Sequence, residues 1–285
     1  KRGNYNINKN TNHGAISIID PIPFVSELRM IKSKNEIKLI DDAINISKQG
    51  FNYIHSIIDQ TMTEYQVQTE LEYIFRKNGS RYNAYPSIVA GGNNACVLHY
   101  IDNNQNLSDA DFILIDAGAE LDYYASDITR TYRVSSKVNA LQTEAYNIVF
   151  EAQQTAINAV KPGVTLKDIH KAALDVLVSG LKSLKLLSGS NEEIISNNLY
   201  AEYYMHGTSH WLGLDVHDSS PYSINKMDIK LKPGMIFTVE PGLYFSERSD
   251  YTDFNKPLLG TGIRIEDDVL VTETGFRNMS KEIIY

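Results

Sequence analysis

Two segments near the start of the chain combine a helix-capping motif with apolar residues at helical spacing. The sequence Ser-Lys-Asn-Glu at 33–36 is a capping box, and the apolar pattern behind it predicts a helix from about 34 to 59. The sequence Thr-Glu-Tyr-Gln at 63–66 is a second capping box, and its helix should end at Gly79, after two basic residues. We therefore expect a pair of helices in the first part of the chain.

A second helix pair is predicted about one hundred residues later. The pattern at 141–160 is amphipathic, Pro-Gly at 162–163 interrupts it, and Thr-Leu-Lys-Asp at 165–168 caps a helix that runs to about Leu187. The two pairs align when Thr165 is placed on Thr63, an offset of 102 residues. Residue identity across that offset is poor, so a duplication and two unrelated helix pairs both fit the pattern.

Strand-like segments follow each predicted helix pair. They are 86–101 and 111–134 after the first pair, then 203–217, 234–245 and 262–273 after the second. Two αα-then-β halves would place helices against one face of a curved, mainly antiparallel sheet. We therefore expect an α+β fold.

The composition is that of an ordered globular protein, and it argues against several functions. The 285 residues are 42% hydrophobic, which is enough for a substantial core. The net charge of -8 and the pI near 5.4, without a basic patch, argue against nucleic-acid binding. Cys96 is the single cysteine, which excludes an internal disulfide and fits a reducing cytoplasm; no motif supports a catalytic thiol. No apolar run is long enough to cross a bilayer.

The first residues are expected to be a linker. Residues 1–15 are polar and rich in asparagine, and Asp-Pro-Ile-Pro at 20–23 interrupts the chain before the first predicted helix. The sequence begins Lys-Arg-Gly without a methionine, so residue 1 is not expected to be the natural start. We expect a linker at 1–24 and one globular domain at 25–285.

Two aspartates lie within neighbouring strand-like segments. Asp116 follows an Ile-Leu-Ile run, and Asp127 lies in the next segment. If a hairpin turns symmetrically between Leu121 and Asp122, the two aspartates are directly opposite on one face, with Cβ atoms about 5 Å apart. The alternatives are a bulged hairpin or aspartates that face solvent.

Two glutamates have the same character. Glu240 ends an apolar strand just before Pro-Gly at 241–242, and Arg264 and Glu266 share one face of an alternating strand. A buried charge without a partner is unfavourable, so such acids usually pair with a cation or bind a metal. For each acid alone, a structural network with arginine is the better explanation.

A histidine-rich segment at 206–218 makes metal binding by these acids the better explanation. It reads His-Gly-Thr-Ser-His-Trp-Leu-Gly-Leu-Asp-Val-His-Asp and holds three of the seven histidines and the only tryptophan. Gly207 and Gly213 argue against a long helix, so we expect a strand end followed by a loop. Imidazole binds metals and transfers protons near neutral pH. Together with four embedded acids, this segment favours a metal site.

These motifs resemble the metal-dependent aminopeptidase P and prolidase family, which shares the pita-bread fold with methionine aminopeptidase. The resemblance runs from about residue 27 to 280 and is closest to the catalytic domain of bacterial Xaa-Pro aminopeptidase. Five motifs carry it in order: Leu-His-Tyr at 98–100, Asp-Ala-Gly at 116–118 with Asp-Ile-Thr-Arg-Thr at 127–131, the histidine-rich segment, Thr-Val-Glu-Pro-Gly-Leu-Tyr at 238–244, and Gly-Ile-Arg-Ile-Glu-Asp-Asp at 262–268.

The resemblance implies a two-metal centre with five ligands: Asp116, Asp127, His210, Glu240 and Glu266. Asp127 and Glu266 would bridge the metals, with Asp116 on one side and His210 and Glu240 on the other. Such an oxygen-rich set suits Mn²⁺, with Co²⁺ or Zn²⁺ as alternatives. Two ions roughly 3.5 to 4 Å apart could generate a hydroxide nucleophile and hold the scissile carbonyl.

Other residues receive roles around that centre. The resemblance places His99, His206 and His217 in the substrate pocket, where they would donate hydrogen bonds or transfer protons; His99 in the core and His217 as a loop-orienting residue are the alternatives. Arg264 is expected to orient Glu266. Tyr244 is expected to be a partner of the ligands or a packing residue. Trp211 is expected at the base of a proline pocket or in the core. The other histidines, His13, His55 and His170, are expected at the surface or in packing.

The family implies hydrolysis of the bond between an N-terminal residue and a following proline. Ser-His-Trp-Leu-Gly at 209–213 resembles aminopeptidase P more than the prolidase dipeptidases, which act on Xaa-Pro. A catalytically silent fold-mate that binds peptides is a further alternative, although such relatives lose metal ligands. Family members carry an N-terminal domain that assists oligomer formation and shapes the substrate entrance. We expect it to be missing from this chain, and we expect a cytoplasmic homo-oligomer at full length.

Overall fold

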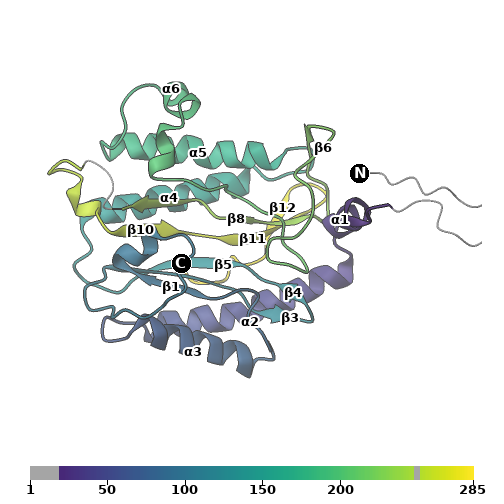
Figure 1. Ribbon diagram of the computed structural model, residues 1–285, viewed down its shortest axis with the longest axis horizontal. Helices are drawn as coiled ribbons and strands as arrows, with labels where there is room; N and C mark the ends of the chain where they lie inside the picture. The colour runs from purple at the N-terminus through teal and green to yellow at the C-terminus, as the bar shows by residue number, and fades with distance from the viewer. Residues whose placement is uncertain (1–18, 247–250) are drawn as a thin grey trace, which may run out of the picture.

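The structure, a computed structural model, describes residues 19–246 and 251–285. Its two halves each consist of a helix pair and antiparallel strands, and in Figure 1 the strands lie between α2 and α3 on one side and α4 and α5 on the other. No helix among these residues is long and apolar enough to span a membrane.

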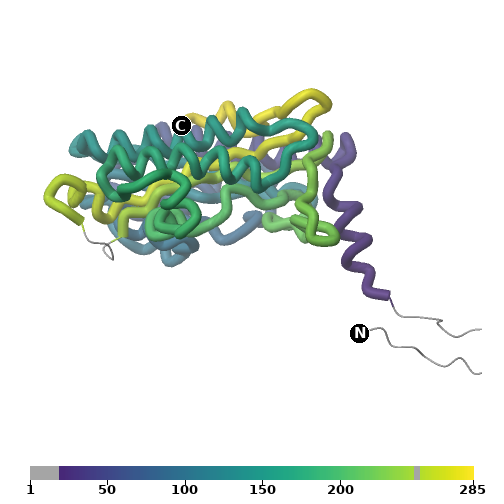
Figure 2. The backbone as a smooth tube through the Cα atoms, turned by 90° about the horizontal axis from the view of Figure 1, so that it is seen from above, coloured from purple at the N-terminus to yellow at the C-terminus, as the bar shows by residue number. Residues whose placement is uncertain are grey.

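The first half contains three helices, one 3₁₀ helix and five strands. They are α1 (Ile22–Met30), α2 (Lys34–Ile57), α3 (Glu64–Lys77), β1 (Ile88–Gly91), η1 (Gly92–Cys96), β2 (Phe112–Ala117), β3 (Glu120–Leu121), β4 (Tyr124–Ala125) and β5 (Ile128–Arg133). Residues 1–18 of the predicted linker lie outside the described residues. Helix α1 begins at Ile22, so the last residues of the predicted linker are helical. Figure 2 shows α1 projecting from the body of the molecule.

The second half repeats the helix pair and adds shorter elements. They are α4 (Ala140–Asn158), α5 (Leu166–Ser183), α6 (Asn191–Ser196), η2 (Leu199–Glu202), β6 (Ser223–Ile224), β7 (Met227–Asp228), β8 (Ile236–Val239), β9 (Gly242–Phe245), η3 (Lys256–Leu258), β10 (Thr261–Arg264), β11 (Asp267–Val271) and β12 (Phe276–Asn278). Helix α5 ends four residues before the predicted Leu187.

Side-chain caps fix where the long helices begin. The predicted capping boxes of α2, α3 and α5 are all formed, with both reciprocal hydrogen bonds present in each. Helix α4 has a further box, between Asn139 and Gln142, which the sequence patterns did not predict. Gly79 follows α3 with φ +101°, a conformation that favours glycine, so the predicted stop is confirmed.

The strands of the two halves meet at β5. All pairings among the described strands are antiparallel: β1 with β2, β2 with β5, β3 with β4, β6 with β7, β9 with β10, and β11 with both β8 and β12. Thr129 forms an isolated bridge with Glu266, and the Thr131 hydroxyl lies 2.9 Å from the carbonyl oxygen of Arg264. The connected strands therefore bring residues from both halves to one place.

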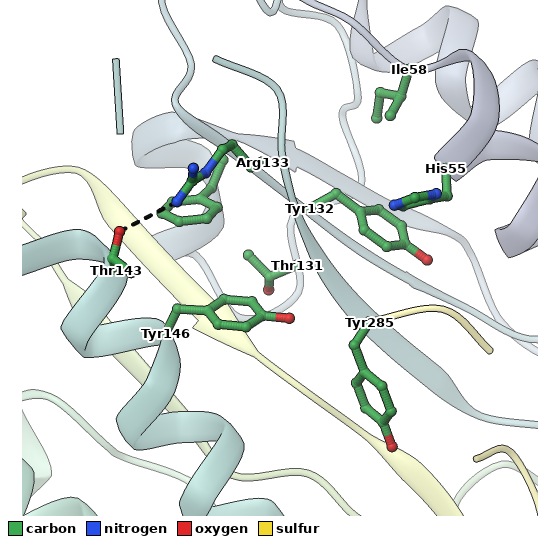
Figure 3. A pocket seen from close by; sticks show the side chains of 9 residues that line it. His55, Ile58, Thr131, Tyr132, Arg133, Thr143, Tyr146 and Tyr285 are labelled. Atoms are coloured by element: carbon green, nitrogen blue, oxygen red, sulfur yellow. Dashed lines mark hydrogen bonds between the residues drawn. The ribbon is translucent and has the colours of Figure 1, made fainter. Parts of the chain in front are cut away.

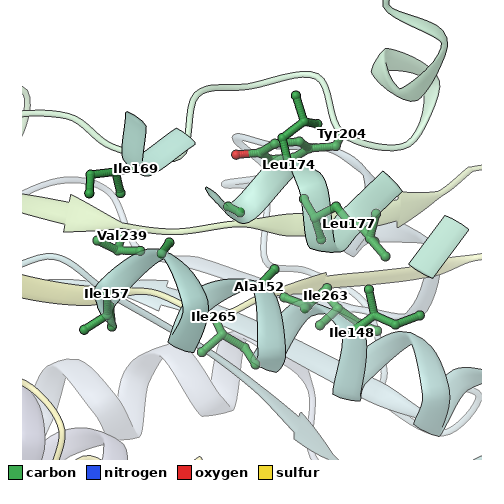
Figure 4. Packing of buried hydrophobic residues seen from close by; sticks show 14 of the residues in the cluster. Ile148, Ala152, Ile157, Ile169, Leu174, Leu177, Tyr204, Val239, Ile263 and Ile265 are labelled. Atoms are coloured by element: carbon green, nitrogen blue, oxygen red, sulfur yellow. The ribbon is translucent and has the colours of Figure 1, made fainter. Parts of the chain in front are cut away.

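Each helix pair packs on the strands of its own half. Apolar residues of α2 and α3 pack with those of β1, β2 and β5. In the larger core, Ile148 and Ile157 of α4 lie near Ile263 and Ile265, and Leu177 of α5 joins the same cluster (Figure 4). The expected α+β arrangement of two αα-then-β halves is confirmed.

Two strand predictions are wrong in part. The segment 203–217 contains no strand and pairs only through a bridge between Trp211 and Phe237, because its backbone turns repeatedly to form a loop. The strand-like segment 86–101 is a strand only over β1. Gly92, with φ +54°, then turns the chain into η1.

The hairpin between β2 and β5 also differs from the symmetric prediction. Its turn is formed by Asp122 and Tyr123, which both have positive φ, as in a type I′ turn. Asp116 therefore pairs with Thr129, and Asp127 lies two residues away from direct opposition. The prediction of directly opposed aspartates is wrong, but a two-residue offset preserves the face, and both side chains reach the same cavity.

Candidate metal centre

The cavity where the two halves meet has a volume of about 590 Å³. Among its lining residues are all nine that the sequence singled out: His99, Asp116, Asp127, His206, His210, His217, Glu240, Arg264 and Glu266. Three of them come from the first half and its loops, and six from the second. The fold therefore brings together residues up to 167 positions apart in the chain.

Three of the predicted ligands are close enough to share one metal ion. Asp127, His210 and Glu266 offer ligand atoms that all lie within 4.8 Å of one another. Asp127 immediately precedes β5, and Glu266 lies between β10 and β11. His210 is fixed against β8, because its backbone N–H donates to the Thr238 hydroxyl at 3.1 Å and its carbonyl accepts from the Thr238 N–H at 2.9 Å.

The ring of His210 is oriented as a metal ligand would be. Nδ1 lies 3.2 Å from the carbonyl oxygen of Trp211, which can only accept, so Nδ1 carries the proton of this hydrogen bond. Nε2 points at the acids, 3.2 Å from Asp127 Oδ2 and 3.4 Å from Glu240 Oε1. A metal-binding histidine is commonly held in this way, with its second nitrogen donating to a carbonyl.

The other two predicted ligands border this cluster. Glu240 Oε1 accepts a hydrogen bond from the Thr238 hydroxyl at 3.2 Å. Asp116 is held by Arg264, whose NH2 lies 2.6 Å from Oδ2, and by the Tyr85 hydroxyl, 2.6 Å from Oδ1. Tyr85 also donates toward Asp127. All five predicted ligands are thus adjacent.

The charges of this cluster fit divalent cations. Four carboxylates lie together, and one of them, Asp116, forms an ion pair with the buried Arg264. Burial and the neighbouring acids raise the pKa of Glu266 well above its ordinary value, and they raise that of Glu240 to about 7. Burial opposes protonation of His210, but its hydrogen bond to Asp127 and the charge of Glu240 outweigh this and raise its pKa to about 9. The residues present therefore lack positive charge that metal ions would supply.

The metal-free protein is expected to lose stability as the pH rises from about 6.5 to 9. The pKa of His210 is raised from 6.5 to about 9, and that of Glu240 from 4.5 to about 7. Above pH 6.5 these two groups hold more protons in the folded protein than in the unfolded chain, so rising pH favours unfolding, whereas below pH 6.5 the lowered pKa of His206 offsets the effect of Glu240. Added Mn²⁺ binds deprotonated ligands and is expected to reverse the slope. Thermal unfolding with chelator and with Mn²⁺ measures both; a chelated protein that becomes more stable across this range would contradict the charge assignment.

Both ring nitrogens of His206 form hydrogen bonds within the protein. Its Nδ1 donates to the carbonyl oxygen of Gly207 at 2.8 Å, and its Nε2 accepts from the Tyr244 hydroxyl at 2.8 Å. Tyr244 in turn accepts from Arg264 at 2.9 Å. Burial and the Arg264 charge lower the pKa of His206 to about 3, so it is neutral near pH 7.

His99 and His217 present a different arrangement. Both line the cavity, both are exposed, and no hydrogen bond joins either ring to another residue in the described ranges. The ring centroid of His217 lies 4.1 Å from that of His210. Burial and the charge of His210 lower the pKa of His217. These two rings are available to a bound molecule.

Sequence reasoning missed the residues that support the ligands. The Thr129 hydroxyl donates to Glu266 at 2.6 Å, and a buried oxygen of Asp268 accepts from the backbone N–H of Asp127 at 3.1 Å. Tyr85 contacts two predicted ligands. Thr129 and Asp268 lie inside the quoted motifs, which was a usable signal, whereas nothing distinguishes Tyr85 among eighteen tyrosines.

The remaining histidines and the tryptophan lie away from the centre. Trp211 is fully buried, its indole N–H donates to the carbonyl of Pro221 at 3.0 Å, and it belongs to the large core. His170 packs near Tyr204 and bonds to the Thr208 hydroxyl at 2.8 Å. His55 borders a second hollow of about 290 Å³, beside Tyr132 (Figure 3). These are the packing and surface roles expected for them; His13 lies outside the described residues.

Known proteins share this arrangement over most of the chain. Metallopeptidase family M24 matches residues 38–273. Xaa-Pro aminopeptidase of Haemophilus influenzae is 42% identical over 90% of this chain, and that of Escherichia coli is 39% identical over 94%. The solved structure of Zn-substituted E. coli aminopeptidase P in complex with product is similar with a TM-score of 0.88 and 39% identity, over 93% of this chain.

The match covers only part of each relative. The chain spans 59% of the H. influenzae protein and 60% of the E. coli protein, and 60% of the solved chain. Within that span the fold agrees with that of the solved relative. The chain belongs to metallopeptidase family M24 and has the pita-bread fold of aminopeptidase P.

Proposed function

We propose that this protein is a metal-dependent exopeptidase that releases the N-terminal residue from peptides with proline in second position. The observation that carries the proposal is the convergence of five metal-type ligands and two available histidines in one cavity. The relatives named Xaa-Pro aminopeptidase support the choice of substrate. The presence of all five ligands argues against a catalytically silent fold-mate.

Two divalent ions, most suitably Mn²⁺, are proposed to occupy the cluster. Asp127 and Glu266 would bridge them, Asp116 would bind one, and His210 and Glu240 the other. Four carboxylates and one imidazole form a mainly oxygen donor set, which suits Mn²⁺, while Co²⁺ and Zn²⁺ are alternatives. The four negative charges would balance two divalent cations.

Bound ions would supply a water-derived nucleophile at neutral pH and polarise the scissile carbonyl. The chain's own residues would orient and protonate the substrate. His99 and His217 can donate imidazole N–H groups to the substrate carbonyl oxygen or to the leaving proline nitrogen. Neutral His206, locked by Tyr244, and Arg264, locked on Asp116, would hold this side of the cavity in a fixed shape.

Apolar side chains complete the cavity and suit a proline ring. Leu98 and Ile101 line it from the first half, and Val216 lines it from the histidine-rich segment. A ring without a backbone N–H gains from such contacts and leaves no donor unsatisfied. The apolar wall therefore supports the proposed proline-containing substrate.

Comparing two peptide lengths separates the proposal from its nearest alternative, a prolidase-type dipeptidase. We expect an Xaa-Pro-Yaa tripeptide to be hydrolysed with a higher kcat/KM than the matching Xaa-Pro dipeptide. Release of the free N-terminal amino acid, measured with Mn²⁺ present, gives both values. An Xaa-Ala-Yaa tripeptide serves as the control for the proline requirement. Preference for the dipeptide would instead identify a dipeptidase.

We also propose a cytoplasmic location and a homo-oligomer at full length, without nucleic-acid or membrane partners. The acidic net charge of -8 supports the absence of nucleic acid. The single cysteine, Cys96, excludes an internal disulfide, which suits a reducing compartment. The proposal of an oligomer rests on the family resemblance.

A further inference from the structure

Two cations at the end of α1 form ion pairs with the end of the histidine-rich segment. NH2 of Arg29 lies 2.5 Å from Asp218 Oδ1 and 2.6 Å from Asp215 Oδ2, and Lys32 Nζ lies 3.3 Å from Asp218 Oδ2. The side chains of Lys32 and Asp218 are each only 1% exposed. Each carboxylate oxygen of Asp218 thus has its own charged donor, which restricts rotation of the carboxylate.

The cationic end of this contact is fixed to the body of the protein. The backbone N–H of Lys32 donates to the carbonyl of Gly234 at 2.8 Å, in the turn just before β8. The Ser220 hydroxyl donates to the carbonyl of Ser26 at 3.2 Å, which adds a second connection between α1 and the segment after Asp218. Gly234 precedes β8 and Glu240 follows it, so Lys32 is anchored at one end of the strand whose other end leads to a proposed metal ligand.

The anionic end closes the loop that carries His217. The backbone N–H of Asp218 donates to the carbonyl of Trp211 at 2.9 Å, so residues 211–218 form a loop closed at its base. The carboxylate packs directly on Gly213, where an added Cβ would lie 2.2 Å from Oδ2. His217 immediately precedes Asp218. Since its ring makes no hydrogen bond within the described residues, its position depends on the loop backbone and on packing against the His210 ring.

We propose that Arg29 and Lys32 are positioning residues that act through Asp218 to hold His217 over the metal-ligand cluster. This inference rests on the proposed function, because the catalytic role of His217 belongs to it. Two cations converge on one buried carboxylate next to a cavity-lining histidine, and the contact between Lys32 and Asp218 spans 186 residues.

A double-mutant cycle tests the proposal. Removing Asp218 alone would leave Lys32 buried without an anion, so both charges are removed together in Lys32→Met with Asp218→Asn. We expect kcat for an Xaa-Pro-Yaa peptide to fall by about 10- to 100-fold, as for small displacements of catalytic groups, with KM and bound metal unchanged. In a His217→Ala background the same two changes should alter kcat by less than about twofold, because the group they position is absent.

A matched pair on α2 is the control. Lys38 and Asp42 form an ion pair at 2.6 Å, but their side chains are 73% and 38% exposed. Lys38→Met with Asp42→Asn should leave kcat unchanged. An unchanged kcat in the Lys32 and Asp218 variant, or a loss of equal size with and without His217, would overturn the proposal.

A readout without turnover separates this inference from the proposed function. In protein labelled at the histidine rings, the NMR signal of His217 should shift in the Lys32 and Asp218 variant, while that of His55, in the other hollow, should not. If the wild-type protein fails to cleave Xaa-Pro-Yaa, the proposed function is wrong and the His217 signal alone decides. An unshifted His217 signal would overturn the positioning role.

Discussion

Replacing Asp127 with asparagine is expected to remove nearly all peptidase activity while leaving the protein folded. Asp127 lies 3.2 Å from His210 Nε2 and within 4.8 Å of a ligand atom of Glu266, so it is close to two of the other proposed ligands. A metal-held nucleophile contributes several kcal/mol, and about 4 kcal/mol corresponds to roughly a 1000-fold loss in kcat/KM. The measurements are kcat/KM with saturating Mn²⁺ and the number of metal ions bound per chain.

The same substitution should not lower the stability of the metal-free protein. Burial and the charge of neighbouring Asp116 raise the pKa of Asp127, so its negative charge is unfavourable in the metal-free protein. Removing it should leave the melting temperature of the chelated protein equal or higher. Asp122→Asn is the matched control, since Asp122 is exposed in the turn of the same hairpin and asparagine tolerates its positive φ. If the Asp127→Asn protein kept more than a tenth of the wild-type activity, Asp127 would be ruled out as a metal ligand.

Replacing Arg130 with methionine is expected to destabilise the fold by about 3–5 kcal/mol, because it leaves a charge buried without its partner. Arg130 and Asp267 are completely buried and lie 2.7 Å apart, on the far side of β5 from the cavity. The guanidinium also donates to the carbonyl of Glu266 at 2.6 Å and lies 4.3 Å from the ring centroid of Tyr285. At about 2–4 °C per kcal/mol for a chain approaching this size, the melting temperature should fall by about 6–20 °C.

The exposed ion pair between Arg277 and Asp41 gives the matched control. Its side chains are 44% and 29% exposed, so Arg277→Met should change the stability by less than about 1 kcal/mol. Thermal and denaturant unfolding of both variants measures the difference. If Arg130→Met were no more damaging than Arg277→Met, the buried network around Asp267 would not be a stabilising element.

Local signals were sufficient for most helix boundaries. Each predicted capping box joins residues three positions apart, so Ser33 and Glu36, for example, needed no tertiary information to be recognised. The five residues that the motifs proposed as ligands likewise all line one cavity. Helix α1 was not predicted, because its contacts with Asp215 and Asp218 come from residues far away in the chain.

The remaining errors have tertiary or conformational causes. The hairpin register was misplaced because its turn uses Asp122 and Tyr123 at positive φ, without the glycine that usually marks such a turn. The segment 203–217 has the apolar content of a strand, but its residues are distributed between core, cavity and ion pairs. Tyr85 was missed because only its two hydrogen bonds, with Asp116 and Asp127, distinguish it, and these form only in the folded chain.

The most direct test of the central claim is to measure peptide hydrolysis as a function of bound metal. Purified protein is stripped with chelator and titrated with Mn²⁺, and both bound ions per chain and release of the N-terminal residue from an Xaa-Pro-Yaa peptide are recorded at each step. The account predicts no turnover without metal, full activity as occupancy approaches two ions per chain, and little binding in Asp127→Asn protein. Turnover by the stripped protein, or metal binding without any turnover of the proline peptide, would contradict it.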